Sequence, residues 1–346
     1  MIEKGYQYKL YDIDGTFKRV IDESIILETP NFSMSLNSGQ GDMTITLAVD
    51  IDNTYYELYD VVKIYEYDAD NTSGRLIYTG FVSRIRRTYD TAQRIQLDLL
   101  GIWLLLNRVI WYSGWFVFTK TQDPAQTIKD MIDYFNTKYT AWWLSYAWGN
   151  ISNYWSSISI EFDHTKCIDV LNNIVAATQD YYRYIAPDGQ VYYKTKTYSA
   201  HDHIFRLEYD CDQLSITENG DTIINKLYVD YGGTPTTAWP YEDATSQTDY
   251  GLSELYELKS DLQNSWSANT YWNSYITQYK NYTKEIVINI NTKYDIESIR
   301  PWQFVKLLNC NYDVSESQIA KVDYSYDWAR LYLDQYTTLQ KTIYNP

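Results

Sequence analysis

One short run near the N-terminus has the composition of a catalytic motif: Asp12-Ile13-Asp14-Gly15-Thr16. In phosphatases with a DxDGT string, the first aspartate attacks phosphorus and the second acts as acid and base beside Mg²⁺. Such a motif follows a buried, apolar, parallel strand. Here the preceding YKLY is short and mixed, and no alternation of strands and helices follows. The run therefore favours a β-hairpin turning at Asp14-Gly15, a dipeptide typical of hairpin turns.

A metal site is the second chemical candidate, at His201, Asp202, His203 and Cys211. Zinc sites usually combine four ligands at recognisable spacing, and this group lacks that spacing. The sequence also contains no GxSxG, HExxH, GxGxxG or P-loop string. We therefore expect a plain polar loop here, no metal, no cofactor, no catalytic residue and a protein that is not an enzyme.

Recognition of another molecule has a stronger candidate in an aromatic segment between residues 141 and 155. Its aromatic residues are Trp142, Trp143, Tyr146, Trp148, Tyr154 and Trp155. Exposed Trp and Tyr are favoured at protein interfaces and stack on ligands such as sugars. Packing against the segment's own domain or a neighbouring subunit is the simpler interpretation, and carbohydrate binding is the alternative.

Arginines form a further candidate on two successive predicted strands: Arg84, Arg86 and Arg87, then Arg94. On a strand, Arg84 and Arg86 share one face and Arg87 points to the other. A solvated or salt-bridged face is the simpler interpretation. Contact with the acidic surface of a second copy is the functional one.

The elements that position these groups follow a β, α/β, β order. Period-2 alternation predicts strands over much of residues 6–101, including a pair on either side of Gly39-Gln40-Gly41. Residues 101–110 break the pattern and suggest a short buried helix or turn. Asp123 and Pro124 predict the start of a helix, and Asp163 or Thr165 opens a second one. A hairpin turning at residues 187–189 closes this middle part.

Strands return after residue 211. We expect a long polar loop over 232–250, helical or mixed segments over 252–262 and 268–283, and four closing strands. The fold class is thus β-rich α+β. We divide the chain into a first β domain at 1–108, an α/β insertion at 109–210 and a second β domain at 211–346.

The amino-acid composition agrees with a β-rich fold class. The chain has 346 residues, with 38 Tyr and 12 Trp, residue types that favour strands. The net charge of −16, from 29 basic and 45 acidic residues, opposes binding to nucleic acid through phosphates. It would suit a surface that DNA slides past.

The sequence shows no targeting or membrane segment. The N-terminus has no apolar targeting segment, and the longest apolar stretch is too short for a membrane span. Three scattered cysteines indicate reduced core thiols. We expect synthesis in a cytoplasm.

The order of segments resembles the tail hub (tail-tip, baseplate-hub) proteins of tailed bacteriophages. The matching segments include NFSMSLNSGQGDMTITLAVD, DVVKIYEYD, IYTGFVSRIRRTYD, TKCIDVLNNIVAAT, PDGQVYYK, ENGDTIINKLYVDYGG and SQIAKVDYSYDWARLYLD. The resemblance covers nearly the whole chain through loose strand patterns. It departs from the family at Trp302, where a turn usually contains glycine.

The resemblance implies two tube-type β-barrel domains around the α/β insertion, and three copies that present six barrels in a ring. It implies a structural virion protein at the tail tip: a homotrimer with a channel for DNA that contacts a distal tail protein or the tail tube and anchors tip or fibre proteins. Since the sequence ends soon after the last predicted strand, we expect no appended peptidase or lysozyme domain. The alternatives are a carbohydrate-binding tail-tip module using the segment from Trp142 to Trp155, and a phosphatase acting through Asp12.

Overall fold

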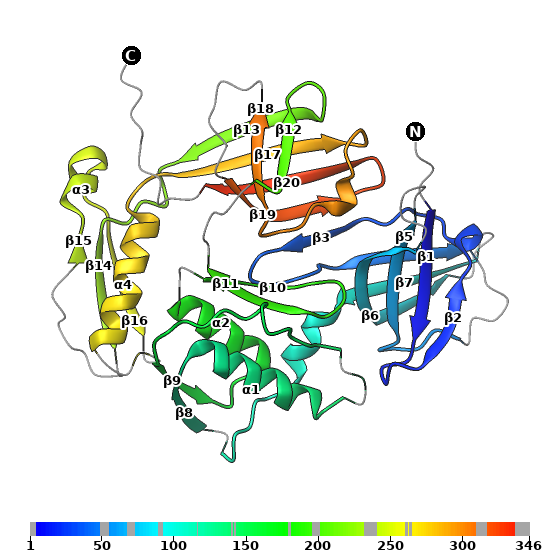
Figure 1. Ribbon diagram of the computed structural model, residues 1–346, viewed down its shortest axis with the longest axis horizontal. Helices are drawn as coiled ribbons and strands as arrows, with labels where there is room; N and C mark the ends of the chain where they lie inside the picture. The colour runs from blue at the N-terminus through cyan, green and yellow to red at the C-terminus, as the bar shows by residue number, and fades with distance from the viewer. Residues whose placement is uncertain are drawn as a thin grey trace.

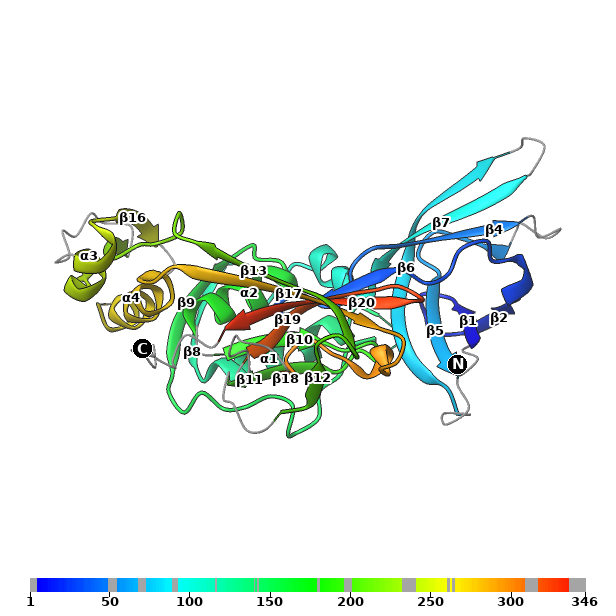
Figure 2. The same cartoon turned by 90° about the horizontal axis from the view of Figure 1, so that it is seen from above.

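The computed structural model contains two curled β-sheets, an α/β region between them in the chain, and a small peripheral α/β unit (Figures 1 and 2). The β-rich fold with few helices agrees with the sequence. The structure describes residues 5–48, 55–67, 73–88, 93–115, 117–139, 141, 143–178, 181–195, 201–231, 241–259, 262, 265–308 and 317–335.

The first sheet has six antiparallel strands. Their order is β2 (Phe17–Ile21), β1 (Gly5–Tyr11), β5 (Val61–Tyr67), β6 (Arg75–Thr88), β7 (Arg94–Gly101) and β4 (Met43–Ala48). β1 alternates as its sequence predicts, with Tyr6, Tyr8 and Leu10 buried on one face. The hairpin at Asp14-Gly15 is confirmed, since β1 and β2 pair directly.

The strands predicted on either side of Gly39-Gln40-Gly41 form, but they do not pair with each other. β3 (Phe32–Ser35) pairs with β19 of the second sheet, while β4 pairs with β7 of the first. The link between them is held by Gln40, which is 1% exposed. Its side chain accepts a hydrogen bond from the Thr79 N–H and donates one to the Ile77 carbonyl, both on β6. The alternation of apolar and polar residues in β3 would be the same whether it paired with β4 or with β19, so this pattern does not predict the partner.

The second sheet has seven strands. They are β12 (His203–Arg206), β18 (Phe304–Leu308), β19 (Ser317–Tyr324), β20 (Trp328–Gln335), β17 (Thr283–Asn291) and β13 (Cys211–Asn219), with β3 also paired to β19. Only β12 and β18 among these pairs are parallel. One hydrophobic core contains side chains of both large sheets. β3 therefore joins two sheets whose apolar faces are buried together.

The α/β region has its own core. It consists of the 3₁₀ segment Ile102–Arg108, β8 (Val117–Gln122), α1 (Pro124–Asn136), β9 (Ile158–Asp163), α2 (Cys167–Ala177), β10 (Tyr181–Ile185) and β11 (Val191–Thr195). The Asp123 carboxylate caps α1 by accepting from the Ala125 N–H at 2.8 Å, and Pro124 occupies the first turn, as predicted. The β8–β9 pair was not predicted.

α2 begins at Cys167, not after Asp163 or Thr165. The residues before it are held extended against the segment that follows the 3₁₀ turn. The Trp111 N–H donates to the Thr165 carbonyl, and the Cys167 N–H donates to the Val109 carbonyl. These bonds to a distant segment prevail over the local capping preference.

The peripheral unit places β15 (Tyr241–Glu242), β14 (Lys226–Tyr231) and β16 (Glu254–Lys259) beside α4 (Ser265–Tyr279), with α3 (Ala244–Tyr250) nearby. Figures 1 and 2 show it at the opposite end of the molecule from the first sheet. The loop predicted over 232–250 is wrong in its described part, which contains β15 and α3. Residues 252–262, expected to be helical or mixed, supply a strand, β16.

Candidate functional site

The Asp12–Thr16 run forms a turn. The Asp12 N–H donates to the Thr16 carbonyl, the Gly15 N–H donates to the Asp12 carbonyl, and the Asp14 carboxylate accepts from the Thr16 N–H. Gly15 has φ +88°, a conformation that favours glycine. The motif's glycine and second aspartate are thus explained by turn geometry alone.

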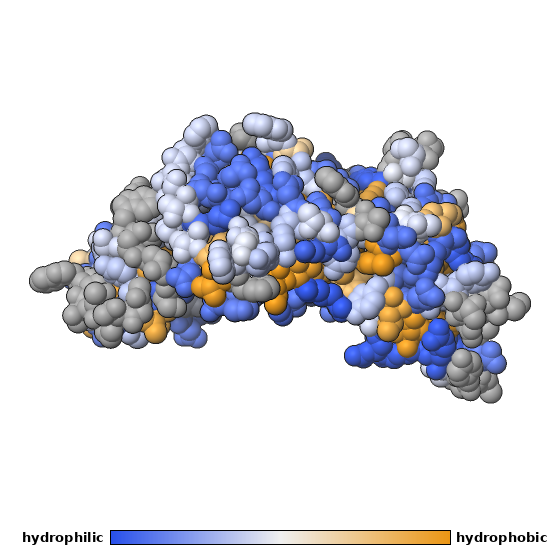
Figure 3. Space-filling model, turned by 90° about the horizontal axis from the view of Figure 1, so that it is seen from below, coloured by the Kyte–Doolittle hydropathy of each residue, from blue (hydrophilic) through white to orange (hydrophobic). Residues whose placement is uncertain are grey.

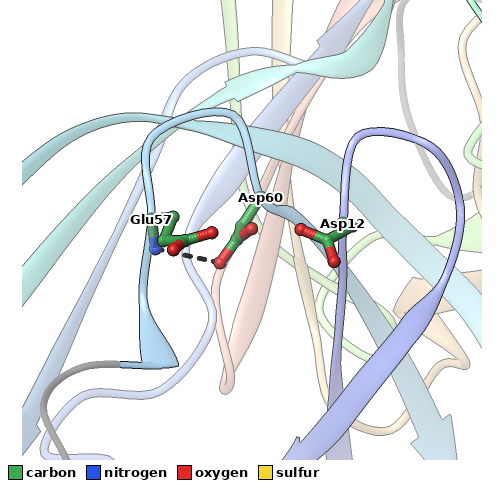
Figure 4. A group of neighbouring side chains, drawn as sticks. All are labelled: Asp12, Glu57 and Asp60. Carbon is green, nitrogen blue, oxygen red and sulfur yellow. Dashed lines mark hydrogen bonds between the residues drawn. The ribbon is translucent and has the colours of Figure 1, made fainter.

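The Asp12 side chain has a different partner. It lies with Glu57 and Asp60 in a cluster of carboxylates that point toward one another (Figure 4). The Lys18 ammonium contacts all three, at 3.0 Å from Asp12, 3.0 Å from Glu57 and 2.7 Å from Asp60. Burial lowers the pKa of Lys18, but its carboxylate partners outweigh this and raise it overall. The carboxylate cluster that could bind a metal cation is therefore already paired with the Lys18 ammonium.

A second acidic cluster has the same character. Glu66, Asp295 and Glu297 lie close together, and Arg75 contacts Glu66 at 3.4 Å and Asp295 at 3.0 Å. Glu66 belongs to the first sheet and Asp295 follows β17 of the second. This cluster therefore ties the two sheets together.

The histidine group does not assemble. His203 is 6% exposed and hydrogen-bonds to the Tyr294 hydroxyl and the Gln303 side chain, each at 2.8 Å. Burial lowers its pKa, so the ring is neutral at pH 7. The Asp202 carboxylate accepts from the Phe304 N–H. Within the described parts of the chain, no group with metal-ligand geometry includes a histidine or cysteine.

Cys167 and Cys211 are both buried, and burial raises the pKa of the Cys167 thiol to about 12. Cys310 lies outside the described residues. A thiol held in its neutral form is a poor nucleophile.

The aromatic segment is only partly a surface. Trp142 lies outside the described residues. Trp143 is 7% exposed, and its indole N–H donates to the Ile13 carbonyl at 2.7 Å, so it anchors the β1–β2 turn to the α/β region. Tyr146 donates to the Asp133 carboxylate. Tyr154 packs edge-on against Tyr181. These residues support the packing interpretation.

Trp148 and Trp155 remain exposed, at 91% and 86%. Trp148 lies beside the Lys129 ammonium of α1, 5.3 Å from its ring. Trp155 has φ +62°, and its N–H donates to the Asp123 carboxylate, which also accepts from the Tyr154 N–H. Figure 3 shows the underside of the molecule as mostly hydrophilic, with separate hydrophobic patches.

The arginines behave as a salt-bridged face. Arg84 and Arg86 lie 4.0 and 2.7 Å from Asp98, on one face of the β6–β7 extension. Arg87 and Arg94 are exposed toward the tip of this extension, which projects from the body in Figure 2.

The structure also forms a pocket that the sequence did not reveal. It is lined by Tyr11, Gly15, Lys63, Thr79, Ala141, Trp143, Pro187, Asp188 and Gly189. These residues come from three strands (β1, β5 and β6), from the β1–β2 and β10–β11 turns and from the aromatic segment. The one local signal is a lysine inside the apolar strand DVVKIYEYD.

No family model matches the chain, and no curated protein matches it by sequence. Solved structures do match. The 43 kDa tail protein of prophage MuSo2 from Shewanella oneidensis aligns with a TM-score of 0.69 and 11% identity, covering 98% of this chain and 100% of that one. A tail protein from Neisseria meningitidis gives 0.65 and 12%, covering 96% and 97%. The prophage tail protein gp18 from Listeria monocytogenes gives 0.63 and 10%, covering 96% and 95%.

These matches show that the chain has the fold of phage tail proteins over nearly its full length. The resemblance drawn from the sequence is confirmed at that level. Among the described residues, no helix is both long enough and apolar enough to cross a membrane.

Proposed function

We propose that this chain is a structural, non-enzymatic component of a phage-type tail, acting as a hub at the distal end of the tail tube. The observation that carries the proposal is the full-length similarity to the Shewanella prophage tail protein. Two curled sheets that share one core, with an α/β region between them in the chain, are consistent with it. The three-domain division at 1–108, 109–210 and 211–346 belongs to the proposal.

In this proposal three copies form a ring, so that six half-barrels surround a channel. The ring contacts a distal tail protein or the tail tube on one side and tip or fibre proteins on the other. A net charge of −16 supports passage of DNA without adhesion, because like charges repel. The protein is made in the host cytoplasm and resides in the virion.

Light scattering and negative-stain imaging test the assembly. We expect a mass three times 40.9 kDa at high protein concentration, with three-fold rings. Immunogold labelling of purified particles should mark the tail tip. Labelling restricted to the capsid, or a monomer that never enters tails, would contradict the proposal. Hydrolysis of peptidoglycan by the pure chain would contradict its non-enzymatic part.

Carbohydrate binding is the second candidate, because Trp148 and Trp155 present nearly complete side chains to solvent. A glycan array tests it. Binding that is lost in Trp148→Ala or Trp155→Ala and retained in Trp115→Ala would support it. Trp115 is the matched control, since it is 76% exposed and lies outside the aromatic segment. An array with no bound glycan would remove this candidate.

A further inference from the structure

The pocket described above lies where the first sheet meets the α/β region. Its volume is about 200 Å³, whereas a cavity of roughly 150 Å³ accommodates benzene. It thus has room for one side chain of that size or slightly more. Gly189 forms part of its wall, with φ +81°, and a Cβ there would lie 2.0 Å from the Trp143 carbonyl. This close backbone contact fixes the wall.

Lys63 supplies a cation to this pocket. Its ammonium lies 5.2 Å from the ring centre of Tyr11 and 5.5 Å from that of Trp143. Among the residues that the structure describes, no carboxylate lies within 4.0 Å of it. Burial lowers the pKa of Lys63, and the charge of Asp188 partly offsets this. The two rings contact the cation but leave its strongest hydrogen-bonding capacity unused.

Thr79 supplies a hydrogen-bond donor beside it. The residue is 2% exposed, lines the pocket, and its Oγ1 has no hydrogen-bond partner among the described residues. Lys63 and Thr79 are direct cross-strand partners in the β5–β6 ladder, so both side chains lie on the same face. A buried hydroxyl without a partner carries a free-energy penalty that a ligand could remove.

Lys63 and Thr79 thus offer an ammonium and a hydroxyl donor on the same face of the sheet, and these donors suit the oxygens of a carboxylate. We propose that this pocket receives an acidic group, an Asp or Glu side chain or a C-terminal carboxylate, from a neighbouring tail protein. The aromatic walls contact the apolar part of that group. A protein partner is favoured over a free anion, because the chain's net charge of −16 repels dissolved anions while a docked neighbour supplies its carboxylate at high local concentration. This inference rests on the proposed role in tail assembly.

Nuclear magnetic resonance titration of the ¹⁵N-labelled chain tests the site. Sodium acetate represents the carboxylate, acetamide is its neutral isostere, and sodium chloride keeps ionic strength constant. Acetate should shift the Thr79 and Gly189 amides and the Trp143 indole N–H in a saturable way. Acetamide and methyl glucoside should not. Shifts from methyl glucoside alone would overturn the proposal in favour of a sugar subsite.

Variants assign the binding to the pocket. Lys63→Met should weaken acetate binding by at least about tenfold, as the loss of a charge-assisted hydrogen bond predicts. Thr79→Val should weaken it several-fold. Lys9→Met is the matched control, because Lys9 pairs with Lys63 in the β1–β5 ladder but stacks on Tyr65 outside the pocket. Equal acetate shifts in the wild type and Lys63→Met would overturn the proposal.

The source of the carboxylate is tested in purified tails. Reductive methylation by formaldehyde and borohydride, followed by mass spectrometry, should modify Lys63 more slowly in tails than in the free chain. Equal rates would show that no partner group fills the pocket. Acetate binding through Lys63 in a chain that never enters tails would instead contradict the proposed function. The two failures are therefore distinguishable.

Discussion

Lys18 and Lys63 lie in the same sheet, yet their surroundings shift their pKa values in opposite directions. Lys18 on β2 contacts three carboxylates, one of which, Asp60, is 2% exposed. Lys63 on β5 has no carboxylate within 4.0 Å among the described residues and faces two aromatic rings beside a pocket that Asp188 also lines. The pKa of Lys18 is raised overall, and that of Lys63 is lowered.

The difference separates a structural cluster from a candidate binding site. The residues around Lys18 include the motif that most resembled a catalytic one, but the Lys18 ammonium already has close carboxylate partners there. Lys63 belongs to no motif, yet its charge and the Thr79 hydroxyl are left to interact with a ligand. A polar side chain that lacks a hydrogen-bond partner and borders a pocket is a better indication of ligand binding than resemblance to a catalytic motif.

Gly189→Ala should give the largest effect, because it breaks the wall that forms the Lys63 pocket. The added Cβ would strain a backbone at φ +81° and meet the Trp143 carbonyl, so we expect a loss of roughly 3 kcal/mol or more in the free energy of unfolding. Gly114→Ala is the control: Gly114 has φ +83° with nothing within 4 Å, and its loss should be about 1 kcal/mol. Urea denaturation measures both. Equal losses of stability in the two variants would mean that the backbone around the pocket shifts to accommodate the added Cβ.

Lys18→Met should have the next largest effect, because it leaves Asp60 buried beside Asp12 and Glu57 without the cation. After allowance for the partial exposure of the other two carboxylates, we expect a loss of about 2 kcal/mol. The Lys18→Met/Asp60→Asn double variant should recover part of this loss. Additive losses in the double variant would contradict a direct Lys18–Asp60 interaction.

The same variant has a predictable pH dependence. The pKa of Asp60 is already raised, mainly by burial, while Lys18 opposes the shift. Without Lys18 the folded state binds a proton more readily than the unfolded state, so stability rises as the pH falls through the raised pKa. Denaturation curves of Lys18→Met should therefore approach those of the wild type in mild acid. A gap that stays constant with pH would contradict this account.

Local signals predicted much of the fold. The Asp14-Gly15 turn, the Asp123 cap and the alternation of β5, β6 and β7 each depend on residues close together in the chain. The partner of β3 could not be predicted, because it depends on β19, almost 300 residues later. α2 likewise starts later than its sequence suggests, since backbone hydrogen bonds from Thr165 and Cys167 to the distant segment at residues 109–111 hold Lys166 extended.

The candidate site was less predictable than the fold. The aromatic segment was identified, but composition does not separate buried Trp143 from exposed Trp148, because burial depends on what the fold brings against each side chain. Here the β1–β2 turn covers Trp143, whereas Trp148 is 91% exposed. The pocket around Lys63 requires five chain segments to meet. No single segment carries its pattern.

Lys63→Met should have the smallest effect, and its sign sharpens the contrast with Lys18. Removing a half-buried cation that has no carboxylate partner should leave the free chain unchanged or more stable, by about 0.5 kcal/mol after solvent screening. The pKa of Lys63 is lowered in the folded state, so the unfolded state binds more protons as the pH approaches 10.5. The free energy of unfolding of the wild type should therefore increase relative to that of Lys63→Met as the pH rises. Urea denaturation at pH 7 and near that limit measures the difference. A loss of stability at pH 7 as large as that of Lys18→Met would mean that Lys63 is a structural residue, and the two sites would no longer differ in kind.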